Sequence, residues 1–218
     1  MRTPKRSEEG ASVLEFAFIT FTLVPLLIGA GVIGVNLVRT LQTEQLARDA
    51  GHMFARGVDF SASGNQEILT NIGSSLNLSA TAGSGNAVVI LSEVTYVDNN
   101  ACATGGAVDT NGNPSGCTNL GKWVFTKRLN IGNSGIRTSS MGTPAGVTIG
   151  SDGGIAASDY VTNTGAVAKF SSVNPYSNVS GAVKGLPSGQ VLYIAEAGAS
   201  EYALAPYGGG STYSFGLF

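Results

Sequence analysis

The sequence has few charged side chains, one histidine and one tryptophan. Charged residues make up 12% of the 218 positions, which is about half the usual share. The net charge is −2, and the charged residues form no long run of one sign. The chain therefore offers no electrostatic surface for nucleic acid, and nucleic acid is not expected as a partner. Polarity comes mainly from hydroxyl and amide side chains, which is typical of an exported or surface protein.

The sequence also lacks the motifs of common enzyme classes. A Ser-His-Asp triad would have to use His52, and no Gly-x-Ser-x-Gly sequence is present. The glycines at 153–154 and 208–210 are not followed by the Lys-Ser/Thr of a phosphate-binding loop. We therefore expect no enzymatic activity, no catalytic residues and no cofactor. The acidic residues of the C-terminal part are interpreted as solvated surface groups: Asp98, Asp109, Glu196 and Glu201.

A calcium site is also not supported. Asp109-x-Asn111-x-Asn113 has the beginning of a calcium-binding loop, but Pro114 follows and no glutamate lies at the twelfth position. We expect no bound metal.

The sequence does contain a long apolar run near its N-terminus. Residues 16–38 carry no charge, and as a helix they would span about 35 Å, enough to cross a bilayer. Pro25 and several glycines interrupt the run, but such residues are tolerated in membrane helices. The preceding basic residues predict a cytoplasmic N-terminus and a C-terminal part outside the cytoplasm; they are Arg2, Lys5 and Arg6.

Two simple interpretations of this run leave something unexplained. A secretory signal peptide has a shorter apolar core, followed by a cleavage site with small residues. A plain signal anchor fits the length but gives no role to Glu15. A carboxylate just inside an apolar segment is costly and so indicates a function, although Glu15 lies near enough to the edge of the run to snorkel to the cytoplasmic interface.

Residues 8–16, Glu-Glu-Gly-Ala-Ser-Val-Leu-Glu-Phe, resemble the class III signal of type IV pilins and pseudopilins. In that family a short basic leader ends in glycine, prepilin peptidase cuts after it, and glutamate is the fifth mature residue. The resemblance places the cut between Gly10 and Ala11 and makes Glu15 the fifth residue. It also implies that Glu15 pairs with the new amine on Ala11 of a neighbouring subunit. Two opposite charges buried together offset part of each other's desolvation cost.

Residues 10–18 are further similar to the N-terminal signature of TadE-type minor pilins of tight-adherence (Flp) secretion systems. Major Flp pilins are far shorter, so a head of this size implies a minor component. The resemblance covers about the first 55 residues. The Gly/Ser/Thr/Asn-rich middle of the chain departs from typical family members.

The helix is expected to continue beyond the apolar run as an amphipathic segment and to stop near Gly57. A helix from residue 11 to about residue 56 would be about 70 Å long, which suits a filament spine. His52 is interpreted as a surface residue of this helix. The apolar stripe of the amphipathic part is predicted at helical spacing: Leu37, Leu41, Leu46, Ala50 and Phe54.

The remaining residues predict a β-rich head. A short helix is expected over 66–76, with Asn65 as its cap. Strands are predicted over 87–97, 122–131 and 190–197, with shorter edge pieces over 202–206 and 212–218. Residues 133–189 have no sustained periodicity and are expected to form ordered loops and short strands.

The two cysteines, Cys102 and Cys117, lie between the first two predicted strands. With the head outside the cytoplasm they are expected to form a disulfide that closes a hairpin arm or surface loop. A loop of about 15 residues would contribute about 3 kcal/mol in the chain-entropy model. Neither cysteine belongs to a CxxC motif, which gives no support to a metal site.

Together these features predict an α+β protein in which a long N-terminal pilin-like helix packs against a small antiparallel sheet with long Gly/Ser/Asn-rich loops. The expected segments are a leader (1–10), a membrane and filament-core helix (11–38), its amphipathic continuation (39–58) and an extracytoplasmic head (59–218). The predicted function is a structural subunit of a Tad/Flp-like pilus that supports adhesion or secretion. Other pilin subunits are its partners, and it resides in the inner membrane before assembly. The alternative is a single-pass anchored surface binding domain that does not polymerise.

Overall fold

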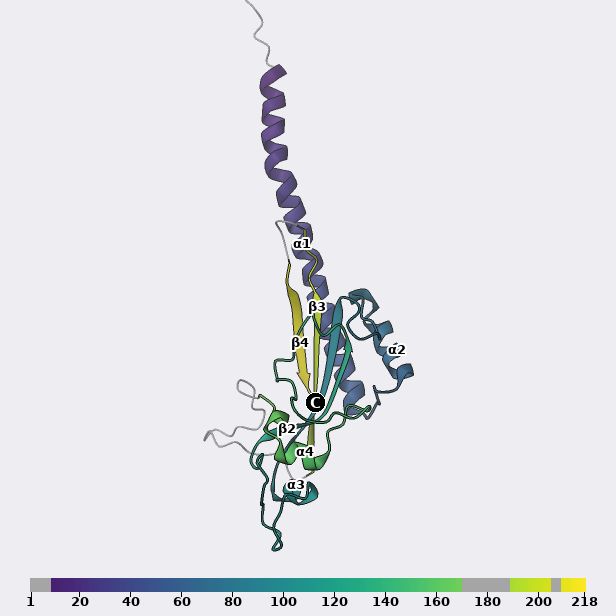
Figure 1. Ribbon diagram of the computed structural model, residues 1–218. Helices are drawn as coiled ribbons and strands as arrows, with labels where there is room; N and C mark the ends of the chain where they lie inside the picture. Colours follow the sequence, from purple (N-terminus) through teal and green to yellow (C-terminus); the bar gives the residue numbers. More distant parts are fainter. Residues whose placement is uncertain (1–8, 170–188, 205–208) are drawn as a thin grey trace, which may run out of the picture.

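The computed structural model describes residues 9–169, 189–204 and 209–218. It is an α+β fold, in which one long N-terminal helix lies against an antiparallel sheet (Figure 1). The helices and strands in chain order are α1 (Glu9–Ala55), α2 (Ser63–Ile72), β1 (Ala87–Tyr96), α3 (Asn99–Thr104), β2 (Trp123–Gly132), α4 (Ala157–Thr162), β3 (Val191–Ser200) and β4 (Ser211–Leu217). Two single 3₁₀ turns lie at Ser74–Leu76 and Thr164–Ala166.

Helix α1 is continuous over 47 residues, about 70 Å, as the apolar run and its amphipathic continuation predict. It passes through Pro25, which removes one backbone donor. In the same half, the hydroxyls of Thr20 and Thr22 donate to carbonyls one turn earlier at 2.8 and 3.1 Å, so neither donor is left unsatisfied in apolar surroundings. The helix stops before Gly57, whose φ of 82° is the left-handed conformation that glycine supplies at helix ends.

The four strands form one antiparallel sheet in the order β2-β1-β3-β4. All the long predicted strands are confirmed within a few residues of their predicted bounds. Strand β3 continues past its predicted end at residue 197 to Ser200, because its last residues still pair with β1 and β4. The expected edge piece at 202–206 is not a strand over its described residues, 202–204; residues 205–206 lie outside the described residues.

The amphipathic half of α1 packs on one face of the sheet. Leu46, Ala50 and Phe54 of the helix contact a buried layer of strand side chains in one apolar core. Small residues on β3, such as Ala195 and Ala197, let the helix approach the sheet closely. Each large side chain buried here stabilises the fold by roughly 1.5–3 kcal/mol. Because these helix side chains share one core with the strands, the second half of the long helix is part of the head.

The opposite face of the sheet is covered by residues 133–169. Met141 and Ile155 from this segment pack against Phe125, Leu192 and Ile194 of the strands. The segment was expected to form ordered loops and short strands; its described part contains isolated β-bridges, as at Ile149↔Ile155, and also the unpredicted helix α4. The expectation for 170–188 lies outside the described residues.

The predicted helix at 66–76 begins earlier and has a different cap. Helix α2 starts at Ser63, with Ala62 in the cap position. The carboxylate of Asp59 accepts bonds from the backbone and hydroxyl of Ser61 at 2.9 and 2.7 Å, which turns the chain before the helix. Asn65 is therefore inside α2, where its side chain donates to the Asp59 carbonyl at 2.7 Å instead of capping the helix.

Candidate functional site

The N-terminal half of α1 extends away from the head (Figure 1). Its apolar side chains are exposed. Phe16, Phe21 and Leu26 are 70%, 80% and 64% exposed. Among the described residues, α1 is the one helix long and apolar enough to cross a membrane. A contiguous apolar surface of this size requires a partner that removes it from water, either lipid or other protein.

The residues that the sequence associates with processing and assembly lie at the start of this exposed segment. Gly10 and Ala11 are in the first turn of α1, and Glu15 follows one turn later. The side chain of Glu15 is exposed between the exposed apolar neighbours Leu14 and Phe16. Within the described part of the chain no cation lies within ion-pair distance of its carboxylate. A counter-charge for Glu15 in an apolar environment would therefore have to come from another molecule or from the undescribed N-terminus.

Polar side chains join α1 to the β3–β4 hairpin just after the fully exposed segment. The Asn36 amide donates to the Tyr202 carbonyl at 3.1 Å, and its oxygen accepts from the Tyr202 amide at 2.7 Å. One turn further on, Nη1 of Arg39 donates to the Ser200 carbonyl at 2.6 Å. A third contact follows on the same side of the helix, where the buried Thr43 hydroxyl lies 2.9 Å from that of Thr212 in β4. We call Asn36, Arg39 and Thr43 the clamp residues, because each of them bonds α1 to the β3–β4 hairpin.

The clamp corrects the predicted apolar stripe of the amphipathic segment. Leu37 and Leu41 are 62% and 53% exposed and do not face the head. Spacings of three and four residues instead place the three clamp residues in line with Leu46, Ala50 and Phe54 on the head-facing side. The clamp residues are polar and so do not belong to an apolar periodicity, although Asn36 within an apolar run was a usable signal, because an amide withdrawn from water needs hydrogen-bond partners.

A second attachment lies at the other end of β4. The ring of Phe218 lies against the backbone of α1 at Gly51, where an added Cβ would be only 2.0 Å from the ring. His52 meets the same ring edge to face, with 4.8 Å between centroids. The Phe218 backbone exchanges hydrogen bonds of 2.9 and 3.1 Å with Tyr193 of β3. His52 is exposed, as expected for a surface residue of the helix, and its ring also contacts the head.

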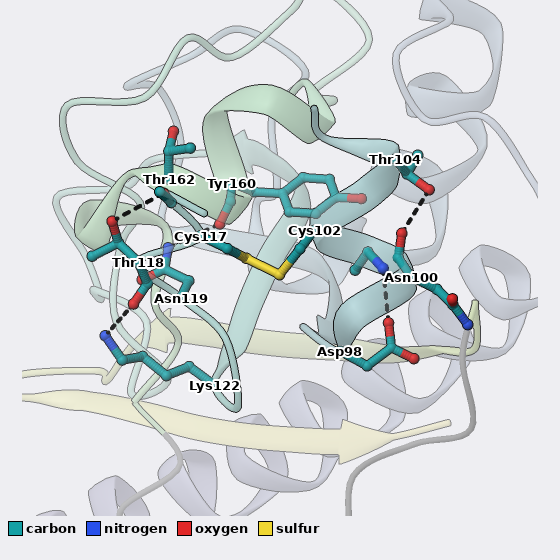
Figure 2. The surroundings of a disulfide bond; sticks show 12 residues. Asp98, Asn100, Cys102, Thr104, Cys117, Thr118, Asn119, Lys122, Tyr160 and Thr162 are labelled. Atoms are coloured by element: carbon teal, nitrogen blue, oxygen red, sulfur yellow. Dashed lines mark hydrogen bonds between the residues drawn. A yellow bond between two sulfur atoms is a disulfide. The ribbon is translucent and has the colours of Figure 1, made fainter. Parts of the chain in front are cut away.

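The predicted disulfide is present. Cys102 in α3 and Cys117 are joined by an S–S bond of 1.98 Å (Figure 2). The loop between them forms the expected hairpin arm, with an antiparallel bridge between Val108 and Pro114. The Asp98 carboxylate caps α3 by accepting from the Ala101 amide at 2.8 Å. The arm and α3 lie at the end of the head farthest from the N-terminus of α1 (Figure 1).

Asn119 ties this arm to the rest of the head. Its side chain donates to the carbonyls of Tyr160 and Asn163 at 2.9 and 2.6 Å, which fixes α4 against the disulfide (Figure 2). Beside the arm is a concave surface that encloses a wide, open pocket with a volume of about 590 Å³. Its lining combines an aromatic ring with amide and carboxylate groups: Tyr96, Asp98, Asn99, Asn100 and Leu120, with the backbone of neighbouring residues.

The interpretation of Glu196 as a solvated surface group is wrong. Glu196 lies in the central strand β3 on the face opposite α1 and has no exposed surface. Its carboxylate accepts hydrogen bonds from Ser139, from the amide of Ser140 at 2.8 Å and from the hydroxyl of Tyr213 at 2.5 Å. The alternation of side chains along β3 could have predicted this burial, because Glu196 lies on the same side of the strand as the apolar residues Leu192 and Ile194.

The counter-ion of Glu196 is Arg128 of β2, with Nη1 3.6 Å from Oε2. Arg128 is 5% exposed and also donates to the Gly142 carbonyl and to Ser139. Burial lowers the pKa of Arg128 to about 10, against the opposing influence of Glu196. The pair fastens the 139–142 segment to the sheet, so Glu196, interpreted from the sequence as solvated, has a structural role.

The described residues contain no cluster of three or more acidic, histidine or cysteine side chains that could hold a metal. Asp109, the first residue of the incomplete calcium-loop sequence, accepts from the amides of Asn111 and Asn113 at 2.9 Å each. These two hydrogen bonds lower the pKa of the Asp109 carboxyl, and the bond from Asn113 has the larger effect. The arrangement is a local turn on the arm.

The features that distinguish this molecule are thus an exposed apolar helix, a head fastened to that helix by polar and aromatic contacts, and a disulfide arm at the far end. The architecture is compatible with a pilin-like or a membrane-anchored protein. Comparisons of the chain with protein-family models, with curated proteins and with solved structures find no match.

Proposed function

We propose that this protein is a structural, pilin-like subunit of a Tad/Flp-type filament, similar to TadE-type minor pilins, and that it works without enzymatic chemistry. It is held in the inner membrane by α1, with the head outside the cytoplasm. Prepilin peptidase cuts it between Gly10 and Ala11, and other pilin subunits then pack around α1. The mature protein leaves the membrane for an extracellular filament that supports adhesion or secretion.

The exposed apolar half of α1 is the observation that carries this proposal. It continues, without a break in the helix, a segment that packs into the core of the head, so one helix runs through anchor and head. A flexible tether would suffice to keep a domain at a membrane. A helix that is continuous through both parts sets the height and orientation of each head when several such helices pack side by side.

Glu15 supports the same proposal. In lipid or among packed helices its charge is costly unless a cation is near. The new amine on Ala11 of an adjacent subunit would supply that cation, because cleavage after Gly10 creates it next to the apolar segment. The pairing offsets part of the desolvation of both groups and fixes the axial register between neighbouring helices.

The cleavage is tested by intact mass and N-terminal sequencing of the protein isolated from its native cells. We expect the mature chain to begin at Ala11 and to be absent from cells that lack the peptidase activity. A mature chain that retains Met1 contradicts the proposal.

The assembly role is tested with Glu15→Ala. We expect normal amounts of the variant in the inner membrane but a loss of the protein from sheared and purified filaments. Asp49→Ala is the matched control, since Asp49 is an exposed carboxylate on the same helix at head level, and it should assemble as the unmodified protein does. Normal filament incorporation of Glu15→Ala would show that the charge pairing is not needed.

A second function, an anchored binding domain that does not polymerise, is favoured by the concave surface beside the disulfide arm. Its aromatic and amide lining is a chemistry that suits hydrogen-bonding surface ligands. The two functions are separated by immunogold labelling of intact cells and of purified filaments. Label on the filaments supports the subunit, and label confined to the cell envelope supports the binding domain.

A further inference from the structure

The connection after β3 lies beside α1 where the fully exposed half of the helix ends (Figure 1). Its described residues 202–204 all have exposed side chains. Tyr202 is 45% exposed and Leu204 is 42% exposed. These are large apolar groups on a part of the head that reaches toward the apolar half of α1.

The backbone of the connection is bonded to α1 at Tyr202. Asn36 bonds both the amide and the carbonyl of Tyr202, and Arg39 donates to the carbonyl of Ser200. Irregular backbone cannot enter the low-dielectric boundary of a bilayer with free amides and carbonyls. The reciprocal bond with Asn36 removes this obstacle at Tyr202, whose side chain is exposed.

Exposed apolar side chains of α1 lie close in sequence to Asn36, which bonds the connection. At the same level of the helix, Ile33 and Leu37 are 72% and 62% exposed, whereas Val32 is only 5% exposed. The helix from Ser12 to Val32 is about 30 Å long, which is the thickness of the hydrocarbon layer. A helix that spans the layer with this segment places Asn36 and Tyr202 at the outer boundary.

We propose that Tyr202 and Leu204 form a lipid-contact surface. In the membrane-resident protein they insert into the interfacial region of the bilayer and hold the head directly against it. Tyrosine favours this depth, because its ring is apolar and its hydroxyl stays hydrated. The charged groups nearby are Arg39, which is half-buried, and Glu201, also half-buried, and both can reach the head-group layer. The proposal rests on the membrane anchoring described under the proposed function.

The test uses the full chain in phosphatidylcholine vesicles that contain lipids with brominated acyl chains, which quench tryptophan on contact. Trp123 is first replaced by phenylalanine, and circular dichroism checks that the fold persists. Three single-tryptophan variants are then compared in that background. Tyr202→Trp reports on the connection, and Leu23→Trp reports on the middle of the apolar helix. Leu120→Trp, at a similarly exposed position just after the disulfide arm, is the matched control.

We expect Tyr202→Trp to be quenched strongly by chains brominated near the head group, and Leu23→Trp by chains brominated near their ends. Leu120→Trp should keep its fluorescence. If Leu23→Trp is quenched while Tyr202→Trp behaves like Leu120→Trp, the lipid contact is wrong and the anchor stands. If Leu23→Trp is also unquenched, the membrane anchor itself is wrong, and the lipid contact fails with it.

Discussion

The aromatic ring of Phe218 occupies the space that a side chain at position 51 of α1 would need. The Cβ of any other residue in place of Gly51 would lie 2.0 Å from this ring. The contact joins the last described residue to the head-facing half of α1, 42 positions after the helix begins at Glu9.

Gly51→Ala is therefore expected to expel the Phe218 ring and to lower the free energy of unfolding by about 1–3 kcal/mol, as other overpacking substitutions do. In a Phe218→Ala background the same change should stabilise the protein by up to about 1 kcal/mol, because alanine is the better helix former. Urea unfolding of the detergent-solubilised protein measures both. Gly34→Ala, on the same helix with open space around it, is the control. Equal effects of Gly51→Ala in both backgrounds would exclude the ring as the cause.

Glu196→Gln should destabilise the head by about 3–5 kcal/mol, because it leaves Arg128 charged, buried and without its counter-ion. The glutamine keeps the size and one acceptor oxygen, so the loss reports on charge. Thermal or urea unfolding measures it. Glu201→Gln, near the end of the same strand but without a side-chain ion pair in the described structure, should change stability by less than about 0.5 kcal/mol. Similar values for the two variants would mean that the Arg128–Glu196 pair contributes little.

The difference between Glu196 and Glu201 illustrates what the sequence could and could not predict. The apolar run, the β-branched segments and the two cysteines each carry a local signal, and α1, the sheet and the disulfide follow from them. Burial of Glu196 depends instead on Ser139, Ser140 and Tyr213, which reach it from other segments. Local patterning marks the position of Glu196 on an inward face but does not supply its partners.

The contacts between the helix and the head likewise could not be predicted from local sequence patterns. Asn36 and Tyr202 are 166 positions apart, and no local period relates them. The sequence therefore predicts a long helix and a sheet, whereas the side of the helix that meets the sheet is decided by contacts over long separations. The exposed side chains of Leu37 and Leu41 are the visible result.

Alkaline pH is expected to weaken the head through Tyr213. Burial, followed by the hydrogen bond to Glu196, raises the pKa of Tyr213 above the usual value, which is about 10 in an unfolded chain. Its contribution to stability is therefore complete below about pH 10 and is lost as the pH rises toward the folded-state pKa. Urea unfolding as a function of pH should show a shallower alkaline decline for Tyr213→Phe than for the unmodified protein.

The comparison between these two proteins removes the contribution of Tyr160 and Tyr193, whose pKa values burial raises equally in both. The buried Arg128, whose pKa is lowered, acts in the opposite direction, and Tyr213 is a minor influence on that pKa. Identical slopes for the two proteins would mean that the phenol gains no stability from its buried position.

Reduction of the Cys102–Cys117 disulfide should lower the free energy of unfolding by about 3 kcal/mol, as expected for a closed loop of this length. Hydrogen exchange should increase first in α3, whose last turn contains Cys102, while α1 and the sheet keep their protection. The double variant Cys102→Ser/Cys117→Ser should behave like the reduced protein. Increased exchange in β1 and β3 to the same extent would show that the bridge supports the whole head and not the arm alone.

Strands β3 and β4 run alongside α1 (Figure 1), and the clamp residues fasten them to it. A pulling force along the helix axis therefore enters the sheet along its strands. The hydrogen bonds between antiparallel strands are perpendicular to the strands, so this force loads many of them in shear at once, whereas a sideways pull on the hairpin would open them one after another. The head should therefore resist a larger force along α1 than a force that pulls the hairpin sideways.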